Sequence, residues 1–258
     1  MRKTIIALHG IGLHHSYLYF VKNFFEEHGF AVLTPDLPGF GKTTSHNRGD
    51  IDSFHTYTKE IAQLSKEVRT KNPKEEIIIW GENMGGTIAL MYGIEYPKCP
   101  QYIIAVNPIL STQLGFSQLK QWQLHLASQF SHDKRIEFPF LLQDLTDDEK
   151  VSTTIASDEL VCQSITTRFW LALSQACLFL YTDAHRLTTP FLIQYSKNSN
   201  LILEKPIEHF YTKASATPKL KESMEGPVLL SLSRKREELF KKALSFIELV
   251  SAPSNDKP

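Results

Sequence analysis

The sequence predicts an α/β fold in which a mostly parallel sheet is flanked by helices on both faces. Over the first 110 residues, short apolar runs alternate with segments of helical periodicity. The apolar runs are hydrophobic at consecutive positions, which indicates strands that are buried on both faces. The length of 258 residues is sufficient for one large domain of this kind.

The predicted elements follow one another in a regular order. The second helix has Asp52 or Ser53 as its expected N-cap, and it ends before Pro73. A later strand is expected at 189–196, and an amphipathic helix at 236–250 closes the fold. The first seven elements are strands at 4–10, 30–39, 75–81 and 101–108 and helices at 15–29, 53–73 and 83–97.

The composition changes in the middle of the chain. Residues 111–187 are rich in Gln, Leu, Ser and Phe, and two helices but no strand are expected there, at 117–130 and 167–181. This organisation predicts an α/β core that is interrupted by a helical cap. The expected division is a core of residues 1–110 and 188–251, a cap of residues 111–187, and a disordered tail of residues 252–258.

Charge and composition narrow the possible partners and the compartment. The 28 Lys and Arg residues balance 28 Asp and Glu residues, so no basic field favours nucleic acid. The three cysteines have irregular spacing and form no C-x-x-C pair of the zinc or redox kind. This pattern favours a protein of the reducing cytoplasm. The N-terminal apolar run is too short for a signal peptide, and none approaches the ~20 residues of a transmembrane helix. We expect a cytoplasmic protein without a cofactor; its oligomeric state is not determined.

One short segment, "IIIWGENMGG" at 77–86, carries the strongest functional signal. An apolar strand runs into Gly81, and two more glycines follow at Gly85 and Gly86. This pattern is typical of a sharp strand-to-helix turn that holds a catalytic nucleophile at its apex. The residue at the apex is Asn83, however, and an amide is not a nucleophile.

Together with "ALHGIG" and "VLTPDLPGFGKT", this segment resembles the α/β-hydrolase fold family. It is most similar to the monoacylglycerol lipase and lysophospholipase branch, which is serine aminopeptidase S33-like, and the cap matches by position only. The family motif is G-x-S-x-G-G, so the resemblance implies that Asn83 stands at the nucleophile position. It also implies an oxyanion hole from the backbone N–H groups of Met84 and Ile11, in a pocket with Gly12 and His14.

The resemblance implies further that an acid and then a histidine follow later in the chain. The acid is expected at Asn198 or Asn200, or alternatively after the strand at 101–108, where Asn107 lies. The histidine is expected near Leu229, but the last histidine of the chain is His209. All three positions of the catalytic triad are therefore degenerate.

Two functional hypotheses follow. The first is a non-catalytic member of the family that binds a small acyl, ester or carboxylate ligand, or a partner protein, beneath the cap. The gibberellin receptor, which has this fold and lacks the triad histidine, is an analogy for it. The second is a carboxylic-ester hydrolase of the lipase or lysophospholipase kind that uses rearranged residues, with His14, His15 or a cap group as the base.

Two other interpretations of these motifs are disfavoured. Asn83 could stand for the Asp nucleophile of dehalogenase-type and epoxide-hydrolase-type relatives, but those enzymes also need a histidine to activate water. The turn "GFGKT" is similar to a phosphate loop, but the required glycine five positions before Gly41 is replaced by Asp36. Asp36 is therefore expected to be a structural turn residue.

The remaining polar candidates have plain structural interpretations. His14 and His15 are expected to begin a helix at the surface, and adjacent histidines on a helix do not share a face, so no metal site is predicted. His185, which lies with Asp183 between the cap and the late strand, is expected to be solvated. Glu82, beside the apex, either contacts a ligand or is solvated.

Overall fold

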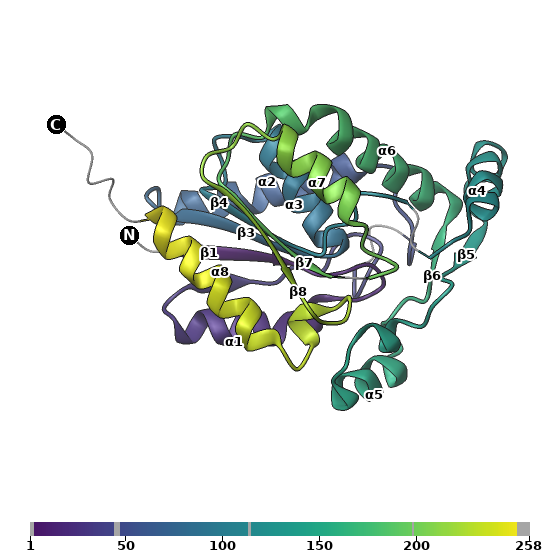
Figure 1. Ribbon diagram of the computed structural model, residues 1–258, viewed down its shortest axis with the longest axis horizontal. Coiled ribbons are helices and arrows are strands. Elements are labelled where there is room, and N and C mark those ends of the chain that lie inside the picture. Colours follow the sequence, from purple (N-terminus) through teal and green to yellow (C-terminus); the bar gives the residue numbers. More distant parts are fainter. Residues whose placement is uncertain (1–2, 44–46, 113–114, 198, 252–258) are drawn as a thin grey trace.

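A computed structural model describes residues 3–43, 47–112, 115–197 and 199–251 of the chain. At its centre lies a six-stranded sheet in which every pair of neighbouring strands is parallel, in the order β2-β1-β3-β4-β7-β8 (Figure 1). The predicted parallel sheet is thus confirmed. The strands are β1 Lys3–Leu8, β2 Ala31–Leu33, β3 Glu76–Glu82, β4 Tyr102–Val106, β7 Phe191–Ser196 and β8 Lys219–Met224.

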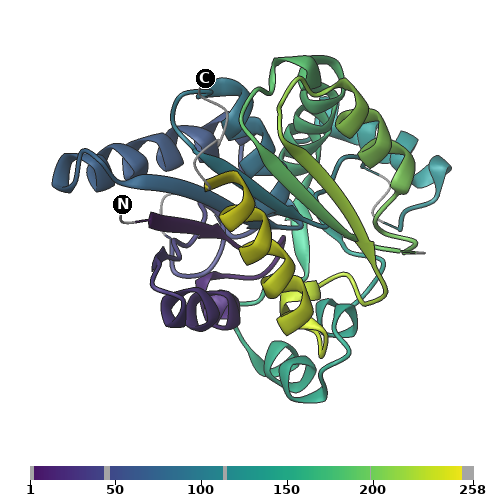
Figure 2. The ribbon, with the colours of Figure 1, turned by 60° about the vertical axis from the view of Figure 1, so that its left-hand side comes forward.

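Helices cover both faces of the sheet, as predicted. Helices α1 and α8 lie together on one face, and α2, α3, α6 and α7 lie on the other (Figures 1 and 2). The side chain of Ser53 accepts a hydrogen bond of 3.2 Å from the N–H of His55, so Ser53 is the N-cap of α2. The helices are α1 Tyr19–Glu27, α2 Phe54–Lys71, α3 Met84–Glu95, α6 Thr167–Asp183, α7 Glu204–Lys213 and α8 Arg236–Ser251.

Side chains that alternate along the strands divide the core into two clusters. In β1, Ile5 belongs to the cluster beneath α1 and α8, whereas Ile6 belongs to the cluster beneath α2 and α3. Trp80 of β3 lies in the first cluster, with its ring 5.5 Å from that of Phe25 and 5.7 Å from that of Phe240. Because both faces are buried, the central strands read as uninterrupted apolar runs.

Three strands escaped the sequence analysis. The edge strand β8 has the sequence KLKESM and keeps most of its side chains partly exposed, so it carries no apolar run. The expectation of no strand within 111–187 is wrong, because β5 (Arg135–Glu137) and β6 (Ser164–Thr166) pair antiparallel there. Three-residue strands are too short to show a periodic pattern. The same region contains the helices α4 Gln118–Phe130 and α5 Glu149–Ser157.

The region between β4 and β7 is tied to the core by a buried carboxylate. Asp50 lies in the loop before α2, and Arg168 at the start of α6 binds it through two nitrogens, at 2.6 and 3.0 Å. The hydroxyl of Thr166 donates a further hydrogen bond of 2.5 Å to Asp50. The side chain of Asp50 is only 7% exposed, so its negative charge depends on these contacts. The exact division at residues 111 and 187 stays a prediction.

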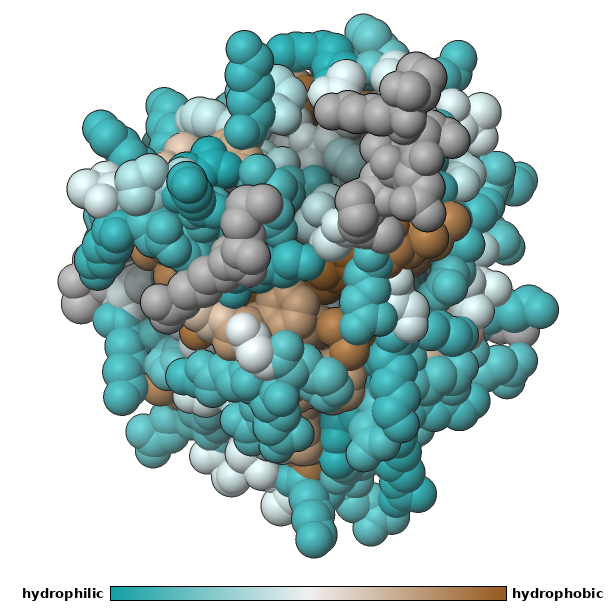
Figure 3. All heavy atoms as spheres, turned by 90° about the vertical axis from the view of Figure 1, so that its left-hand side faces the viewer, coloured by the Kyte–Doolittle hydropathy of each residue, from teal (hydrophilic) through white to brown (hydrophobic). Residues whose placement is uncertain are grey.

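The surface and the chain ends add two observations. Within the described ranges, no helix combines the length and the apolar character needed to cross a membrane. Figure 3 shows the end of the molecule near the chain termini, where hydrophilic side chains surround a smaller hydrophobic area. The predicted disordered tail, residues 252–258, lies outside the described residues.

Replacing Arg168 by alanine should lower the free energy of unfolding by about 1–3 kcal/mol, because a buried carboxylate loses its charged hydrogen-bond donor. Urea unfolding of the two proteins measures the difference. Arg186→Ala is the matched control, since Arg186 forms an exposed ion pair with Asp183 and should cost less than about 0.5 kcal/mol. Equal losses for the two variants would contradict this role of Arg168.

Candidate functional site

The predicted sharp turn is present between β3 and α3. Asn83 has φ 56° and ψ −113°, a left-handed backbone conformation that costs a non-glycine residue about 1–3 kcal/mol. The flanking glycines make this turn possible. A Cβ atom on Gly81 would collide with the backbone of Gly85, and one on Gly85 would collide with the backbone of Leu8. The strand, the strained apex and the helix therefore match the nucleophile elbow that the resemblance implies.

The side chain of Asn83 turns toward the loop after β1. It makes no capping hydrogen bond to α3, and its Oδ1 instead accepts the N–H of Ile11 at 3.3 Å. Asn83 is only 4% exposed. An amide carbonyl thus occupies the acceptor position of a predicted oxyanion donor. An amide side chain also has no hydroxyl or thiol that a base could ionise.

The other predicted pocket residues gather at the same edge of the sheet. Ile11 and Gly12 are buried in the loop after β1, and Met84 is buried at the first position of α3. Gly12 has φ 76°, and a Cβ there would collide with Leu142 and with the backbone of Cys162. Segments from between β4 and β7 therefore lie directly against this loop, so the elbow is covered in this conformation.

Leu229 lies beside Asn83. A methyl group added to Gly10 would be 3.3 Å from Cβ of Asn83 and 3.7 Å from Cδ2 of Leu229, so both side chains adjoin the same point. Leu229 is 2% exposed, and its N–H donates to the carbonyl of Leu145 at 2.8 Å. An aliphatic side chain, which can neither accept nor donate a proton, is thus found where the resemblance places the histidine.

The predicted acid positions hold amides in different surroundings. Asn198 lies outside the described residues, and Asn200 is exposed. Asn107, the alternative position, is fully buried at the end of β4 with φ 45°. Its Nδ2 donates to Ser196 Oγ at 2.8 Å and to the carbonyl of Val228 at 2.7 Å. Asn107 therefore connects the end of β7 to the segment that precedes the predicted histidine position.

Glu82 is neither solvated nor open to a ligand in this conformation. Its side chain is 2% exposed. Its Oε1 accepts a hydrogen bond of 2.9 Å from the N–H of Ser231, and its Oε2 accepts one from the hydroxyl of Ser231. Burial raises the pKa of Glu82 to about 7, although hydrogen bonds from Ser231 and from the backbone of Leu230 act in the opposite direction. The carboxyl group therefore links the elbow to the 3-10 helix Leu230–Leu232 and titrates near neutral pH.

His9 has a purely structural environment. Its Nδ1 donates to the carbonyl of Gly10 at 2.9 Å, and its Nε2 accepts the N–H of Leu37 at 3.0 Å. Complete burial lowers the pKa of His9 to about 4, so the ring is neutral at physiological pH. Both nitrogens are thus used, Nδ1 within the loop after β1 and Nε2 in joining that loop to the one after β2.

His14 forms a buried pair with a carboxylate from a distant part of the chain. Its Nε2 lies 2.8 Å from Oδ2 of Asp158, which also accepts the hydroxyl of Tyr17 at 2.9 Å. His14 is 3% exposed and has extended backbone before the 3-10 helix His15–Leu18, so the expectation that it begins a surface helix is wrong. Asp158 was not predicted, because 144 residues separate the partners and no motif marks it.

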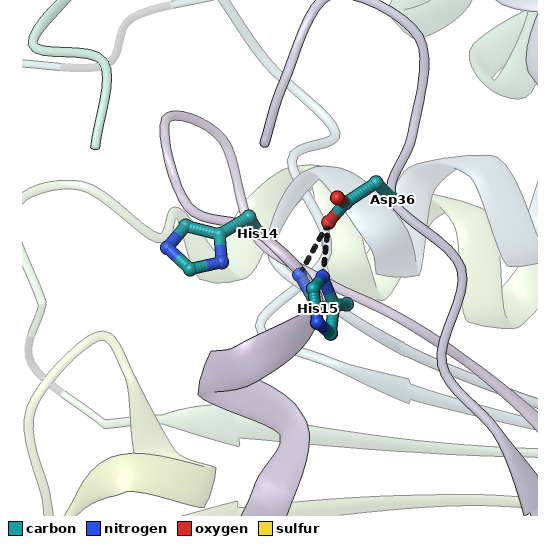
Figure 4. A group of neighbouring side chains, drawn as sticks. All are labelled: His14, His15 and Asp36. Atoms are coloured by element: carbon teal, nitrogen blue, oxygen red, sulfur yellow. Dashed lines mark hydrogen bonds and ion pairs between the residues drawn. The ribbon is translucent and has the colours of Figure 1, made fainter. Parts of the chain in front are cut away.

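Asp36 and His15 form a second pair, next to His14 (Figure 4). Oδ1 of Asp36 lies 2.7 Å from Nδ1 of His15 and accepts its backbone N–H at 2.8 Å, while Oδ2 accepts the N–H of Lys42 at 3.0 Å. Burial opposes ionisation of Asp36, but these hydrogen bonds lower its pKa below the ordinary value. Asp36 is therefore a turn residue, as expected. The side chain of His185 is exposed, and its Nδ1 lies 3.3 Å from the carbonyl of Thr182.

Residues 1–227 match the sequence profile of a protein family described as "Serine aminopeptidase, S33". The chain belongs to this family. The match includes the loop after β1, the elbow and all strands of the sheet, and the observed fold is the α/β-hydrolase fold that the resemblance predicts. For this family member, the sheet and the turn are those of a lipase-like or esterase-like α/β-hydrolase.

Among the individual proteins to which the chain is similar are a phospholipase and two monoacylglycerol lipases. The phospholipase YtpA of Bacillus subtilis is 23% identical over 254 residues, which cover 95% of each chain. The monoacylglycerol lipase of Paleococcus ferrophilus superposes with a TM-score of 0.84 at 18% identity, over 96% of this chain and 94% of that one. A soluble variant of the Saccharomyces cerevisiae monoglyceride lipase, in complex with a substrate analog, gives 0.86 at 18% identity, over 98% and 89%.

The titration of Glu82 predicts a pH dependence of stability. Because its pKa is about 7 in the folded protein and near 4.5 when unfolded, the native state binds more protons between these values and stability falls as pH rises. Glu82→Gln removes this loss, so at pH 8 relative to pH 5 the variant should gain roughly 2.5 kcal/mol over wild type. Urea unfolding at both pH values tests this. Glu225→Gln, at an exposed position, is the control, and parallel curves for wild type and Glu82→Gln would contradict the prediction.

Proposed function

We propose that this protein binds an acyl, ester or carboxylate-bearing ligand at the elbow without hydrolysing it by the serine mechanism of its family. The observation that carries the proposal is the side chain of Asn83, whose amide oxygen accepts the N–H of Ile11 beside Leu229. Serine catalysis requires an ionisable hydroxyl, a base and an acid that orients the base. At the positions that the resemblance assigns to the hydroxyl and the base, this chain carries the amide of Asn83 and the aliphatic side chain of Leu229.

The retained turn supports a binding role. A strained apex persists only when the surrounding structure holds it, and here Gly81 and Gly85 are needed for it. The N-terminus of α3 and the N–H of Ile11 favour a carbonyl or carboxylate oxygen. The bond from Ile11 to Asn83 is long at 3.3 Å, so exchanging the amide oxygen for a ligand oxygen would cost little.

The ligand class comes from the family. The relatives named above are a phospholipase and two monoacylglycerol lipases, and the yeast lipase was crystallised with a substrate analog. A ligand with one acyl chain and a polar ester or carboxylate end would place its oxygen at the N–H groups of Ile11 and Met84. The covering segment with Leu142 would have to move to admit it, because Leu142 lies against Gly12.

A second candidate is a carboxylic-ester hydrolase with rearranged residues, and the lipase and phospholipase names of the relatives favour it. Asp158 holds Nε2 of His14, so the other nitrogen, Nδ1, could take a proton from water. The hydroxide would attack the ester carbonyl, and the proton would pass from Nδ1 to the departing alkoxide. Among the described residues no hydrogen bond joins His14 to Asn83, so this base would act on water and not on the apex.

The first test measures turnover and binding together. A panel of p-nitrophenyl esters should show no hydrolysis above that of an unrelated protein, whereas an amide analogue of a monoacylglycerol, which keeps the carbonyl oxygen but resists hydrolysis, should raise the Tm. Robust turnover would overturn the binding proposal in favour of the hydrolase. In that case His14→Ala should abolish turnover, and His28→Ala, which changes an exposed histidine, should retain it.

A fluorophosphonate probe tests the assignment of the missing residues. Neither the wild type nor Asn83→Ser should be labelled, because a serine at the apex still lacks a base. Asn83→Ser combined with Leu229→His should be labelled, since Leu229 adjoins the apex. Labelling of Asn83→Ser alone would show that a working base already exists nearby and would contradict the assignment of Leu229.

A further inference from the structure

Three side chains from the loops after β1 and β2 bring metal-binding donor atoms together. One donor atom from each of His14, His15 and Asp36 lies within 4.8 Å of the other two (Figure 4). Two imidazoles and one carboxylate form a donor set that suits divalent transition metals. We propose that these residues form a binding site for a divalent transition-metal ion, with Zn²⁺ as the first ion to test. This site goes beyond the proposed function at the elbow.

The strongest observation is the orientation of His14. Its Nδ1 is buried and has no hydrogen-bond partner among the described residues, while Nε2 is held by Asp158 at 2.8 Å. In Figure 4 the ring turns one nitrogen toward His15 and Asp36 and the other away from them. A buried polar atom without a partner is destabilising, so its presence calls for an explanation such as a bound ion.

The partner of His14 has the arrangement that metal sites use. A histidine that binds a metal commonly donates its second ring N–H to a carboxylate, which fixes the ring and the tautomer. Asp158 provides this carboxylate and is held in turn by the hydroxyl of Tyr17 and the N–H of Leu160. With the proton on Nε2, the lone pair of Nδ1 is directed toward the cluster and is available to a cation.

The carboxylate of Asp36 is also fixed in place. The N–H of Lys42 holds Oδ2, and the backbone N–H of His15 holds Oδ1. Gly41 has φ 60°, and a Cβ there would collide with the carboxylate of Asp36. The turn "GFGKT", which is similar to a phosphate loop in sequence, therefore makes room for a carboxylate. One such charge beside two neutral imidazoles leaves a divalent ion partly neutralised and able to take a further ligand.

The separation of the donors allows binding after a small closure. Zn²⁺ lies about 2.0–2.1 Å from its ligands, which places tetrahedral donors roughly 3.3 Å apart. The donor atoms now lie within 4.8 Å of one another, so the most distant pair of them must move closer together. His15 is the adjustable member, because its side chain is 39% exposed. Coordination through its Nδ1 places the ring proton on Nε2, where the hydroxyl of Ser16 lies 3.4 Å away.

The backbone explains why sequence spacing argued against a metal. Adjacent histidines fail to share a face only when both belong to one helix. His14 is extended, with φ −150° and ψ 178°, and only His15 belongs to the 3-10 helix. Their ring centroids are consequently 5.7 Å apart. A metal on Nδ1 of His14 would also block the general-base role of the second candidate function, so the two assignments can be separated.

Isothermal titration of the untagged, chelator-treated protein with Zn²⁺ tests the site. We expect one ion per chain, a loss of affinity of at least about 100-fold in His15→Ala and Asp36→Asn, and a loss of about 10–100-fold in Asp158→Asn. His28→Ala and His185→Ala change exposed histidines elsewhere and should bind as the wild type does. Circular dichroism establishes that each variant is folded, and His15→Ala serves the test if the buried His14 cannot be changed.

Cobalt provides a second readout that identifies the donors. Co²⁺ bound by imidazole and carboxylate should give visible d–d absorption without the intense thiolate charge-transfer band that Cys99 or Cys162 would cause. That spectrum should disappear in His15→Ala. The proposal is overturned if wild type binds no Zn²⁺, if His15→Ala and Asp36→Asn bind as tightly as wild type, or if the cobalt spectrum shows thiolate ligation. None of these outcomes depends on the ester or ligand assays.

Discussion

The strained turn at Asn83 is the constraint on which the rest of the site depends. Asn83, with positive φ, is the single residue between β3 and α3, and the missing Cβ of Gly85 allows the backbone of Leu8 and His9 to approach. This approach places the N–H of Ile11 against the apex side chain. The geometry is set by the backbone and by missing Cβ atoms, so it survives without the serine that it serves in other family members.

The surroundings of the turn decide what it can do chemically. Leu229 adjoins Asn83, and Glu82 reaches from the residue before the apex to Ser231. The segment to which the resemblance assigns a catalytic histidine is therefore hydrogen-bonded to the elbow through a buried carboxyl group, and it carries the aliphatic side chain of Leu229. Since that carboxyl has a pKa of about 7, its protonation links stability to pH in the physiological range. The elbow is thus a packed and hydrogen-bonded unit.

Outside the elbow, three histidines of the loop after β1 form the polar contacts that matter for binding or proton transfer. His9 uses both ring nitrogens within the core, whereas His14 uses one, and its other nitrogen is buried without a hydrogen-bond partner in the part of the chain that the structure describes. This contrast separates a structural histidine from one that is available to a proton or a cation. Both His14 and His15 face carboxylates, Asp158 and Asp36, that belong to other loops. The sheet brings His15 and Asp36 together, because the loops after its strands meet at one edge. Asp158 comes instead from the end of α5, in the region between β4 and β7.

The sequence by itself determined the order of the central strands and helices, the elbow and the absence of a serine at Asn83, because these features show in local periodicity and in glycine spacing. It did not reveal β8, whose polar edge residues give no apolar pattern. Only the tertiary structure decided that Leu229 adjoins the apex and that Asp158 holds His14. The physical reason is distance along the chain: such contacts arise from packing of segments more than a hundred residues apart, and no local pattern encodes them.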